Sequence, residues 1–572
     1  MKNIIVREYL ESLTERDELD YIFPILLEVM GFKIITTPKD TKGLPQYGKD
    51  VVAIGYDSDE IKKRFYFEIK GGADRHITTS NYFKEDGIRE SIIEAKDRSY
   101  NDSSNPNFNS LPAKIVLVHN GILNASVKET FDGFIESQFR KNSSANPENF
   151  EFERWDIYKL SELFTTHLFN EYLLTDNESL LHFKKVLVLI NTPKNDNTDY
   201  FRLIDRIFVK AGGNENLSNR KRLLFFETLN LVSFVIYSYS KDADNLEPAK
   251  RCLPYSVLRL WYWILDNNLE EDDKILAHFK KHFAILNITL QAYFEKTLPI
   301  SKLTNGLWSN KGGRYEQVGF PMRAMDYISH LVFFFNCQEK QNNSDLQESI
   351  GDLIQILNSN DGTSRPLLDC HSIPIVLILN YLIEKRKIGD ACTFLRNVLR
   401  SIRLGWETFR RLPEGKNRID VVIRFIVTRK KSVYYIDQTS HLITILFEYL
   451  AILNMVTEYY EYRQFFIGLK LDLAIYVPYN DAQIKEYLGD ESASHELHLF
   501  RHELSEEGFQ SSIVLDNDFN AYKKKISEYA PFNYEYRTNK VNMGFLITLA
   551  HLYYKTPFFP NAWRDLLRFE FG

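Results

Sequence analysis

Cysteine is scarce in this chain of 572 residues, and its distribution argues against several kinds of site. No two cysteines form a C-x-x-C pair, and the first 251 residues contain none. We therefore expect neither a zinc ribbon nor a disulfide framework. This usage suits the reducing cytoplasm, which we predict as the location of the protein. The four cysteines are Cys252, Cys337, Cys370 and Cys392.

Several other sequence signals are missing. There is no Walker A motif and no G-x-G-x-x-G after a strand, so we expect no built-in NTPase and no dinucleotide cofactor. The N-terminal segment is charged and has no apolar core of the kind found in signal peptides. The most apolar stretch, residues 442–456, contains Glu448 and predicts a buried helix. We therefore expect no association with a membrane.

A strongly basic overall charge is also absent. The formal net charge is −6, with 44% hydrophobic and 26% charged residues, which is typical of a soluble globular protein. These values exclude a wholly basic nucleic-acid coat. They are compatible with a nucleic-acid enzyme, because local patches of charge determine where such a ligand binds.

Helix and strand signals alternate over residues 1–176. Gly31 ends the first predicted helix, and a turn-rich stretch follows the first predicted strand. The order is helix, three strands, helix, strand, helix, strand, helix, which predicts an α/β domain. The predicted helices are 17–30, 85–98, 126–140 and 157–173, and the predicted strands are 32–37, 50–56, 64–71, 114–119 and 150–154.

Beyond this domain the apolar residues recur mostly at helical spacing. No repeat of fixed period occurs, so a regular solenoid is not expected. The predicted fold class is an α/β domain followed by a large, mainly α-helical region. We predict a helix and linker over 177–199, a helical domain over 200–360, and a second helical domain with a basic segment over 361–572.

The segment RFYFEIK suggests the chemistry of the first domain. In a strand, side chains alternate between the two faces, so Glu68 and Lys70 are neighbours on one face, roughly 7 Å apart. Asp50 begins the preceding predicted strand and approaches Glu68 if the two strands pair. Two converging carboxylates bind a hard cation such as Mg²⁺, which activates water and polarises a phosphodiester. Lys70 would orient or deprotonate that water, or stabilise the transition state.

The triplet alone is not specific. Glu94-Ala95-Lys96 and Glu414-Gly415-Lys416 have the same spacing, and Asp272-Asp273-Lys274 is a close variant. None of the three lies in a convincing hydrophobic strand, so we interpret them as solvated charge pairs. A surface ion pair is the alternative interpretation for Glu68 and Lys70. Strand context and the upstream Asp50 favour the catalytic one.

Five segments together resemble the PD-(D/E)XK restriction-endonuclease-like superfamily, and in particular its Mrr-like branch. The glycine–x–aspartate of that branch corresponds to Gly48-Lys49-Asp50, and its E-x-K to Glu68-Ile69-Lys70. The resemblance implies a central mixed sheet flanked by helices, Mg²⁺ dependence with Mn²⁺ as a substitute, and phosphodiester hydrolysis. The matching segments are LDYIFPILLEVMGF, QYGKDVVAI, RFYFEIKGG, KIVLVHNGILNASVKETF and FERWDIYKLSELF.

The same family often carries a glutamate on the first helix, about eleven residues before the glycine that ends it. Counting back from Gly31 gives Asp20, with Glu18 close by. Asp20 is therefore predicted as a further metal or water ligand. The alternative is an acidic residue that the helix dipole favours at an N-terminus.

Two basic regions and one histidine group are candidates for binding. Residues 385–431 hold fourteen Lys or Arg against four acidic residues, which could guide nucleic acid, bind a signalling nucleotide, or pair with acidic neighbours. His495, His498 and His502 include an i, i+4 pair that suits a metal, but H-E-x-x-H is absent and we favour a surface or packing histidine cluster. The predicted phosphate contacts near the site, with a solvated strand end as the alternative, are Lys62, Lys63, Arg64, Lys70, Arg75 and His76.

The expected function is a Mg²⁺-dependent endonuclease, with double-stranded DNA as the favoured substrate. The architecture resembles prokaryotic effectors of defence against phage, in which the second half senses, oligomerises or restrains the nuclease. The partners implied are nucleic acid, a second copy of the chain, and a defence protein or activator. An RNase or structure-specific repair nuclease on the same core is one alternative. A catalytically silent nucleic-acid-binding scaffold is another, against which the intact set Asp50, Glu68 and Lys70 argues.

Overall fold

The computed structural model divides the chain into two compact units, Met1–Pro248 and Ala249–Gly572. Our finer division of the helical region stays a prediction. The structure describes all residues except 1–5, 8, 12, 16–18, 39–46, 86, 99, 101–104, 106, 169–180, 184, 187, 189–196, 341–345, 477–508, 511–512, 529–535 and 569–572.

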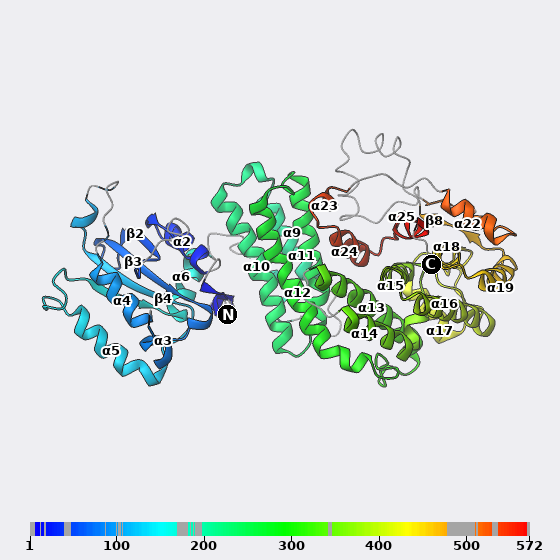
Figure 1. The fold of residues 1–572 in the computed structure, drawn as a ribbon, viewed down its shortest axis with the longest axis horizontal. Coiled ribbons are helices and arrows are strands. Elements are labelled where there is room, and N and C mark those ends of the chain that lie inside the picture. The colour runs from blue at the N-terminus through cyan, green and yellow to red at the C-terminus, as the bar shows by residue number, and fades with distance from the viewer. Residues whose placement is uncertain are drawn as a thin grey trace. The chain divides into compact units, whose positions relative to one another are not determined.

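A five-stranded mixed sheet forms the centre of the first unit (Figure 1). The strands lie in chain order, with β1, β2 and β3 antiparallel and β3, β4 and β5 parallel. Continuous apolar runs such as AKIVLVH build β4, which is buried along its whole length. The strands are β1 (Lys33–Thr36), β2 (Val51–Tyr56), β3 (Lys62–Lys70), β4 (Ala113–His119) and β5 (Glu151–Trp155).

Helices cover both faces of this sheet (Figure 1). On one face Phe23 of α2 packs against Phe67 and Trp155, and its ring centroid lies 5.2 and 6.0 Å from theirs. On the other face Tyr66 and Leu117 belong to two apolar clusters that α3, α4 and α5 complete. The helices are α2 (Asp20–Val29), α3 (Thr79–Phe83), α4 (Ile88–Asp97), α5 (Ala125–Phe139) and α6 (Ile157–Leu163).

The predicted α/β organisation of this region is confirmed, and so is the mixed sheet. Every predicted strand and helix occurs, with shifts of a few residues at the ends. α2 continues through Pro24, and Gly31, with φ of +90°, follows it in the conformation that suits glycine. The short α3 was not predicted. α6 ends earlier than predicted and passes into a wider turn over Phe164–Leu168.

The first unit also contains α9 (Thr198–Ala211) and α10 (Asn219–Asp242). The hydroxyl of Tyr9 donates a hydrogen bond of 2.5 Å to Glu227 of α10, and both side chains are buried. Tyr9 also packs edge-on against Phe234 of the same helix. Within α10, Lys221–Asp242 is long and apolar enough to cross a membrane, but 78% of its apolar window is buried inside the protein, as in a core helix.

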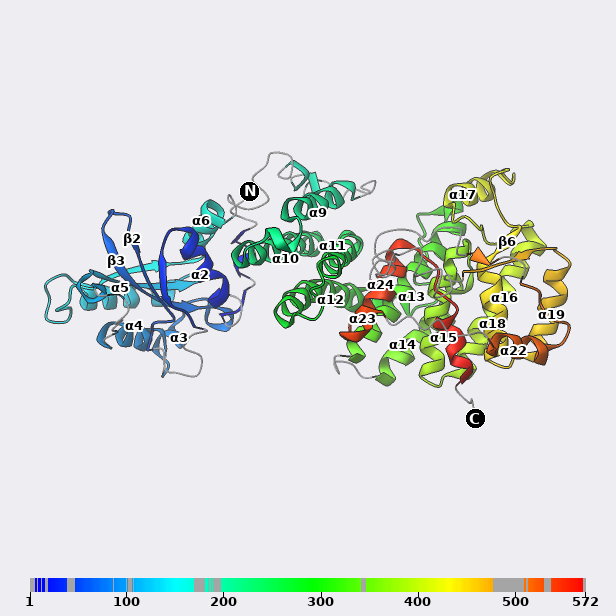
Figure 2. The same cartoon turned by 90° about the horizontal axis from the view of Figure 1, so that it is seen from above.

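The second unit is mainly helical, as expected (Figure 2). α13 contacts α12, α14, α15, α17 and α24. Pairs of two-residue strands, β6 (Thr439–Ser440) with β7 (Asp472–Leu473) and β8 (Ile475–Tyr476) with β9 (Phe509–Gln510), were not predicted. The helices are α11 (Glu247–Asp266), α12 (Asp273–Ser301), α13 (Glu316–Lys340), α14 (Leu346–Ser359), α15 (Ser372–Glu384), α16 (Ile388–Phe409), α17 (Ile419–Thr428), α18 (His441–Ile452), α19 (Val456–Ile467), α22 (Phe519–Ser527), α23 (Arg537–Lys540), α24 (Phe545–Tyr554) and α25 (Asn561–Arg564).

The most apolar stretch of the sequence forms α18, and every residue of this helix is buried. The one carboxylate in it, Glu448, accepts hydrogen bonds from Trp563 and from Arg564, at 2.6 and 2.7 Å. A buried charge is tolerated because it is paired and hydrogen-bonded. The prediction of a buried core helix here is confirmed.

Candidate active site

Strand register brings Asp50 to Glu68. Val51 is paired with Phe67 in the antiparallel β2–β3 ladder, and one further step places Asp50 opposite Glu68. The Oδ2 atom of Asp50 accepts a hydrogen bond of 2.7 Å from the backbone N–H of Ile69. The carboxylate of Asp50 is therefore held against the strand that carries the E-x-K triplet, as the sequence predicted.

Glu68 and Lys70 form an ion pair on one face of β3. Lys70 Nζ lies 2.6 Å from Glu68 Oε1, and the two side chains are 17% and 4% exposed. The solvated surface ion pair that we kept as an alternative is excluded by this burial. Burial alone would lower the pKa of Lys70, but the carboxylates of Glu68, Glu15 and Asp50 outweigh it and raise that pKa.

Glu15 is a further carboxylate at this site, and the sequence analysis missed it. Its Oε2 atom accepts a hydrogen bond of 3.1 Å from the backbone N–H of Gly71, the residue that follows Lys70. Burial raises the pKa of Glu15, and Lys70 is the cation that most opposes this shift. The site therefore draws on three separate segments of the chain.

Close packing holds the Glu15 segment in place. A Cβ atom on Gly71 would lie 2.8 Å from the backbone nitrogen of Glu15, so only glycine permits this approach. The side-chain amide of Asn120 donates to the carbonyl oxygens of Leu10 and Leu13, at 2.6 and 2.7 Å. The segment before Glu15 is thus tied to the end of the central sheet.

The Gly48-Lys49-Asp50 motif has a structural explanation. Gly48 has φ of +70°, and a Cβ atom there would lie 2.0 Å from the carbonyl oxygen of Ser91 in α4. Lys49 is buried, and its ammonium group donates to the carbonyl oxygen of Arg98 at 2.8 Å, just past the end of α4. Burial lowers the pKa of Lys49 to about 8. The first two residues dock the strand on α4, which leaves Asp50 to face Glu68.

The candidate site contains more carboxylates than cations. Burial, and then the neighbouring Glu68, raise the pKa of Asp50 well above its ordinary value. Three carboxylates, those of Asp50, Glu68 and Glu15, surround the single ammonium of Lys70. Such a donor set fits a hard divalent cation, which would offset the charge that one lysine leaves uncompensated.

His119 is another neighbour that the sequence did not reveal. It ends β4 in register with Lys70, so both side chains lie on the same face of the sheet. It is fully buried, and its Nδ1 atom lies 3.0 Å from the carbonyl oxygen of Arg75. Burial lowers the pKa of His119 to about 4. A neutral imidazole therefore stands beside the site near pH 7.

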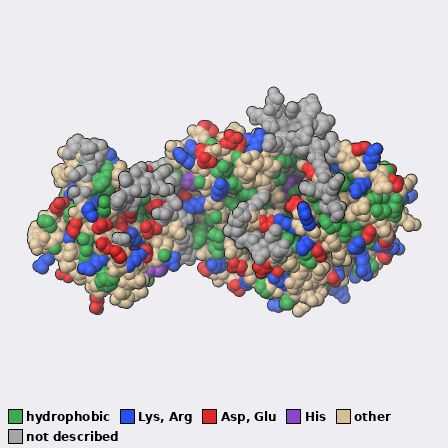
Figure 3. Space-filling view, viewed as in Figure 1, with side chains coloured by type: hydrophobic (Ala, Val, Ile, Leu, Met, Phe, Trp, Pro, Cys, Tyr) green, Lys and Arg blue, Asp and Glu red, His purple; other side chains and the backbone are tan. Residues whose placement is uncertain are grey.

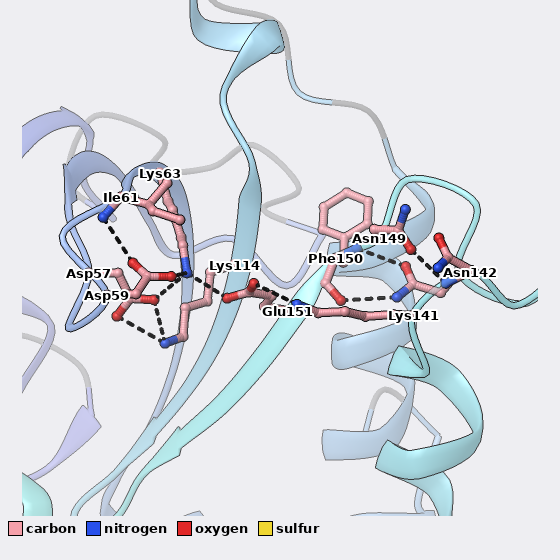
Figure 4. Close-up of polar contacts among 11 residues, drawn as sticks. Asp57, Asp59, Ile61, Lys63, Lys114, Lys141, Asn142, Asn149, Phe150 and Glu151 are labelled. Atoms are coloured by element: carbon pink, nitrogen blue, oxygen red, sulfur yellow. Dashed lines mark hydrogen bonds and ion pairs between the residues drawn. The ribbon is translucent and has the colours of Figure 1, made fainter.

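A tighter cluster of carboxylates lies elsewhere in the sheet (Figure 4). Among the described residues, Asp57, Asp59 and Glu151 form an acidic group in which one carboxylate oxygen from each lies within 4.8 Å of the other two. However, the ammonium group of Lys63 contacts all three carboxylates at 2.7 Å. Lys114 adds a second ammonium 2.9 Å from Asp57. These carboxylates already surround cations, so we assign the cluster a structural role.

This cluster corrects the predicted set of phosphate contacts. Lys62, Lys63 and Arg64 begin β3, whereas Lys70 ends it, so they lie roughly 20 Å from the site. Lys63 is 2% exposed and cannot reach a ligand at the surface. Arg75, by contrast, follows Lys70 closely in the chain, and its guanidinium binds the carbonyl oxygen of Glu11 at 2.6 Å.

The remaining acidic and histidine candidates have mixed outcomes. Asp20 begins α2, and its role as a ligand stays a prediction. Glu18 lies outside the described residues. So does the histidine group of His495, His498 and His502.

The other triplets lie outside strands, as predicted, but they are not all solvated charge pairs. Glu414 is fully buried, and its carboxylate accepts from the backbone N–H groups of Arg418 and Ile436, at 2.5 and 3.3 Å. Asp272 caps the N-terminus of α12. Glu94 lies on α4. Glu414 and Asp272 thus stabilise local backbone structure.

Comparisons with known protein families, with curated proteins and with solved structures found no match for this chain. The interpretation of the site rests on its geometry and on the motif quoted above.

Proposed function

We propose that residues 1–176 form a metal-dependent nuclease of the PD-(D/E)XK type, which hydrolyses phosphodiester bonds. The observation that carries this proposal is the hydrogen bond from Ile69 to Asp50, which holds that carboxylate opposite Glu68 with Lys70 on the same face. The mixed sheet with helices on both faces is the core that the resemblance implies. A restriction-endonuclease-like fold is part of the proposal.

Each residue has a role in this scheme. Asp50 and Glu68 would hold Mg²⁺ or Mn²⁺, and Glu15 is placed to contribute a further oxygen ligand. A bound Mg²⁺ supplies Lewis-acid polarisation of the phosphodiester and lowers the pKa of a coordinated water. Lys70 carries a positive charge at neutral pH, so it can orient the water and stabilise the charge that develops on phosphate oxygens.

Double-stranded DNA is the substrate that we favour, from the resemblance stated above. On the face shown in Figure 3, Lys and Arg side chains are interspersed with Asp and Glu. A surface of mixed charge suits an enzyme whose binding of nucleic acid is controlled by another part of the chain. It suits a protein that coats nucleic acid with high affinity less well. We therefore propose that the helical remainder senses, oligomerises or restrains the nuclease, as in a prokaryotic effector of defence against phage.

A cleavage assay tests the proposed function. Purified full-length protein is incubated with plasmid, linear DNA and RNA, in Mg²⁺, in Mn²⁺ and in EDTA. Wild type should cut in either metal but not in EDTA, and Glu68→Ala and Lys70→Ala should each lose about 100-fold or more in rate. Lys274→Ala, an exposed lysine of a similar triplet, is the matched control and should cut like wild type.

Equal cutting by wild type and Lys70→Ala would refute the site. If RNA alone is cut, the proposed activity becomes that of an RNase that uses the same residues. Metal-independent cleavage would refute the role of Asp50 and Glu68 as ligands.

A further inference from the structure

The basic segment 385–431 divides into paired and unpaired side chains. In at least five positions a carboxylate of the described residues neutralises the cation at 2.5 to 2.8 Å, which is the paired arrangement that we kept as one alternative. Two of these carboxylates, Glu458 and Glu461, come from α19. The paired cations are Lys385, Arg396, Arg403, Arg418 and Lys431.

Three other arginines lie at the ends of two helices: Arg410 and Arg411 follow α16, and Arg429 follows α17. The guanidinium groups of Arg411 and Arg429 lie 5.9 and 4.8 Å from the centre of the same ring, that of Phe409. Arg410 lies 5.6 Å from the ring of Trp406, one turn earlier in α16. We call Phe409, Arg410, Arg411 and Arg429 the Phe409 site.

No carboxylate of the described residues neutralises this group. Within the part of the chain that the structure describes, the guanidinium groups of Arg410, Arg411 and Arg429 form no hydrogen bond or ion pair. The two acidic residues nearest in sequence have other partners: Glu407 pairs with Arg403 at 2.7 Å, and Glu414 accepts hydrogen bonds from two backbone N–H groups. Burial lowers the pKa of Arg411, and the neighbouring charges of Arg429 and Arg365 lower it further.

Helix ends explain only part of this arrangement. The C-terminus of a helix attracts cations, and Arg410 and Arg429 are the residues that directly follow α16 and α17. Two carbonyl groups near this end of α16, those of Gly405 and Trp406, however, accept hydrogen bonds from the backbone N–H groups of Arg411 and Arg410. The side chains of Arg410 and Arg411 therefore stay available, and the like charges of Arg411 and Arg429 lie beside one ring, that of Phe409.

We propose that the Phe409 site binds the phosphate groups of a nucleotide or of a nucleic-acid strand. The planar guanidinium group matches phosphate oxygens with two parallel hydrogen bonds, which favours phosphate over a simple counter-ion. The ring of Phe409 is 40% exposed. Exposed aromatic rings beside arginines are suited to stacking bases. This site is independent of the proposed nuclease.

Binding measurements in EDTA test the site without any need for cleavage. The two probes are a fluorescein-labelled duplex DNA, followed by anisotropy, and the dinucleotide pApA, followed by calorimetry. Arg411→Gln with Arg429→Gln should weaken binding about tenfold or more. For DNA, the slope of log affinity against log salt should fall by about one for each lost phosphate contact.

Arg396→Gln with Arg403→Gln is the matched control, because both residues lie on α16 but are paired with glutamates. This double variant should bind like wild type. Arg411→Lys keeps the charge and tests the guanidinium geometry in a variant that disturbs packing least; it should bind more weakly than wild type.

Binding of DNA alone identifies a nucleic-acid strand as the source of the phosphate, and binding of pApA alone identifies a free nucleotide. Either result supports the site if the Arg411 and Arg429 variants lose it. The proposal is overturned if wild type binds neither probe, or if the double variant at Arg411 and Arg429 binds as tightly as the control.

Discussion

The carboxylate of Glu15 accepts a hydrogen bond from the backbone N–H of Gly71, immediately after Lys70. This contact joins two parts of the chain that are 56 residues apart. It connects the N-terminal segment with the end of β3, where Glu68 and Lys70 lie. The proposed metal site therefore depends on how that segment packs as well as on the strands.

Glu15→Gln should reduce Mg²⁺-dependent cleavage about 10- to 100-fold and raise the Mg²⁺ concentration needed for half-maximal rate. The amide keeps the size of the side chain but removes a charge that a divalent cation needs. Glu11→Gln is the control, because Glu11 pairs with Arg7 at a partly exposed position. Unchanged metal dependence in Glu15→Gln would exclude Glu15 as a ligand.

Gly71→Ala should impair cleavage while leaving the fold intact, because the new Cβ atom would lie 2.8 Å from the backbone of Glu15 and displace it. Gly133→Ala is the opposite case, since a Cβ atom there meets nothing within 4 Å and the residue is inside α5. It should keep full activity and gain about 0.5–1 kcal/mol in unfolding free energy. Urea unfolding and cleavage rates measure both effects, and equal activity of the two variants contradicts the packing argument.

Lys63→Met should destabilise the first unit by about 3 kcal/mol, because it leaves the carboxylates around Lys63 without their central cation. Lys62→Met, at the exposed neighbouring position, should change stability little. Thermal unfolding measures both. If EDTA lowers the unfolding midpoint of the wild type, and Asp57→Asn abolishes this effect, the cluster holds a metal instead.

Stability should fall as the pH drops below 6.5, in part through His371 in the second unit. Its Nδ1 atom accepts a hydrogen bond of 3.1 Å from the backbone N–H of Leu367, and burial lowers its pKa to about 3. Between pH 6.5 and 3 the unfolded chain binds a proton that the folded chain excludes, so acid favours unfolding. The cost is about 1.4 kcal/mol per pH unit in that window.

His371→Asn tests this dependence, because its side-chain oxygen can accept the same hydrogen bond and does not titrate. Unfolding free energies from urea titrations at pH 7, 6 and 5 should decline less steeply in the variant than in wild type. Parallel declines would show that His371 does not contribute.

Strand alternation was sufficient to predict the placement of Glu68 and Lys70, because period two leaves little freedom once the strand is recognised. The side chain of Lys63 obeyed the same rule: it points to the opposite face from Arg64. The sequence KKR nevertheless suggested a solvated strand end. The burial of Lys63 depends on Glu151, which is 88 residues away in sequence, and no local pattern reveals such a partner.

Glu15 was missed for a similar reason. It precedes α2 in a stretch without clear periodicity, and counting back from Gly31 selected Asp20 instead. The glycine pair after Lys70 was the one available signal, since two adjacent glycines indicate close approach of another backbone. In the basic segment, the acidic partners on α19 lie about 60 positions further along the chain, so pairing could not be distinguished from a binding surface.

The contact between Tyr9 and Glu227 bears on how the α/β domain can be separated from the rest of the protein. A fragment that stops at residue 176 would remove the helix on which Tyr9 is buried and expose an aromatic ring at the start of the segment that carries Glu15. Such a fragment would keep every strand of the sheet yet lose support for one of its carboxylates. The domain therefore needs the residues through α10 in order to fold by itself. Experiments that test its activity apart from the rest of the chain should begin with a fragment that ends near Pro248.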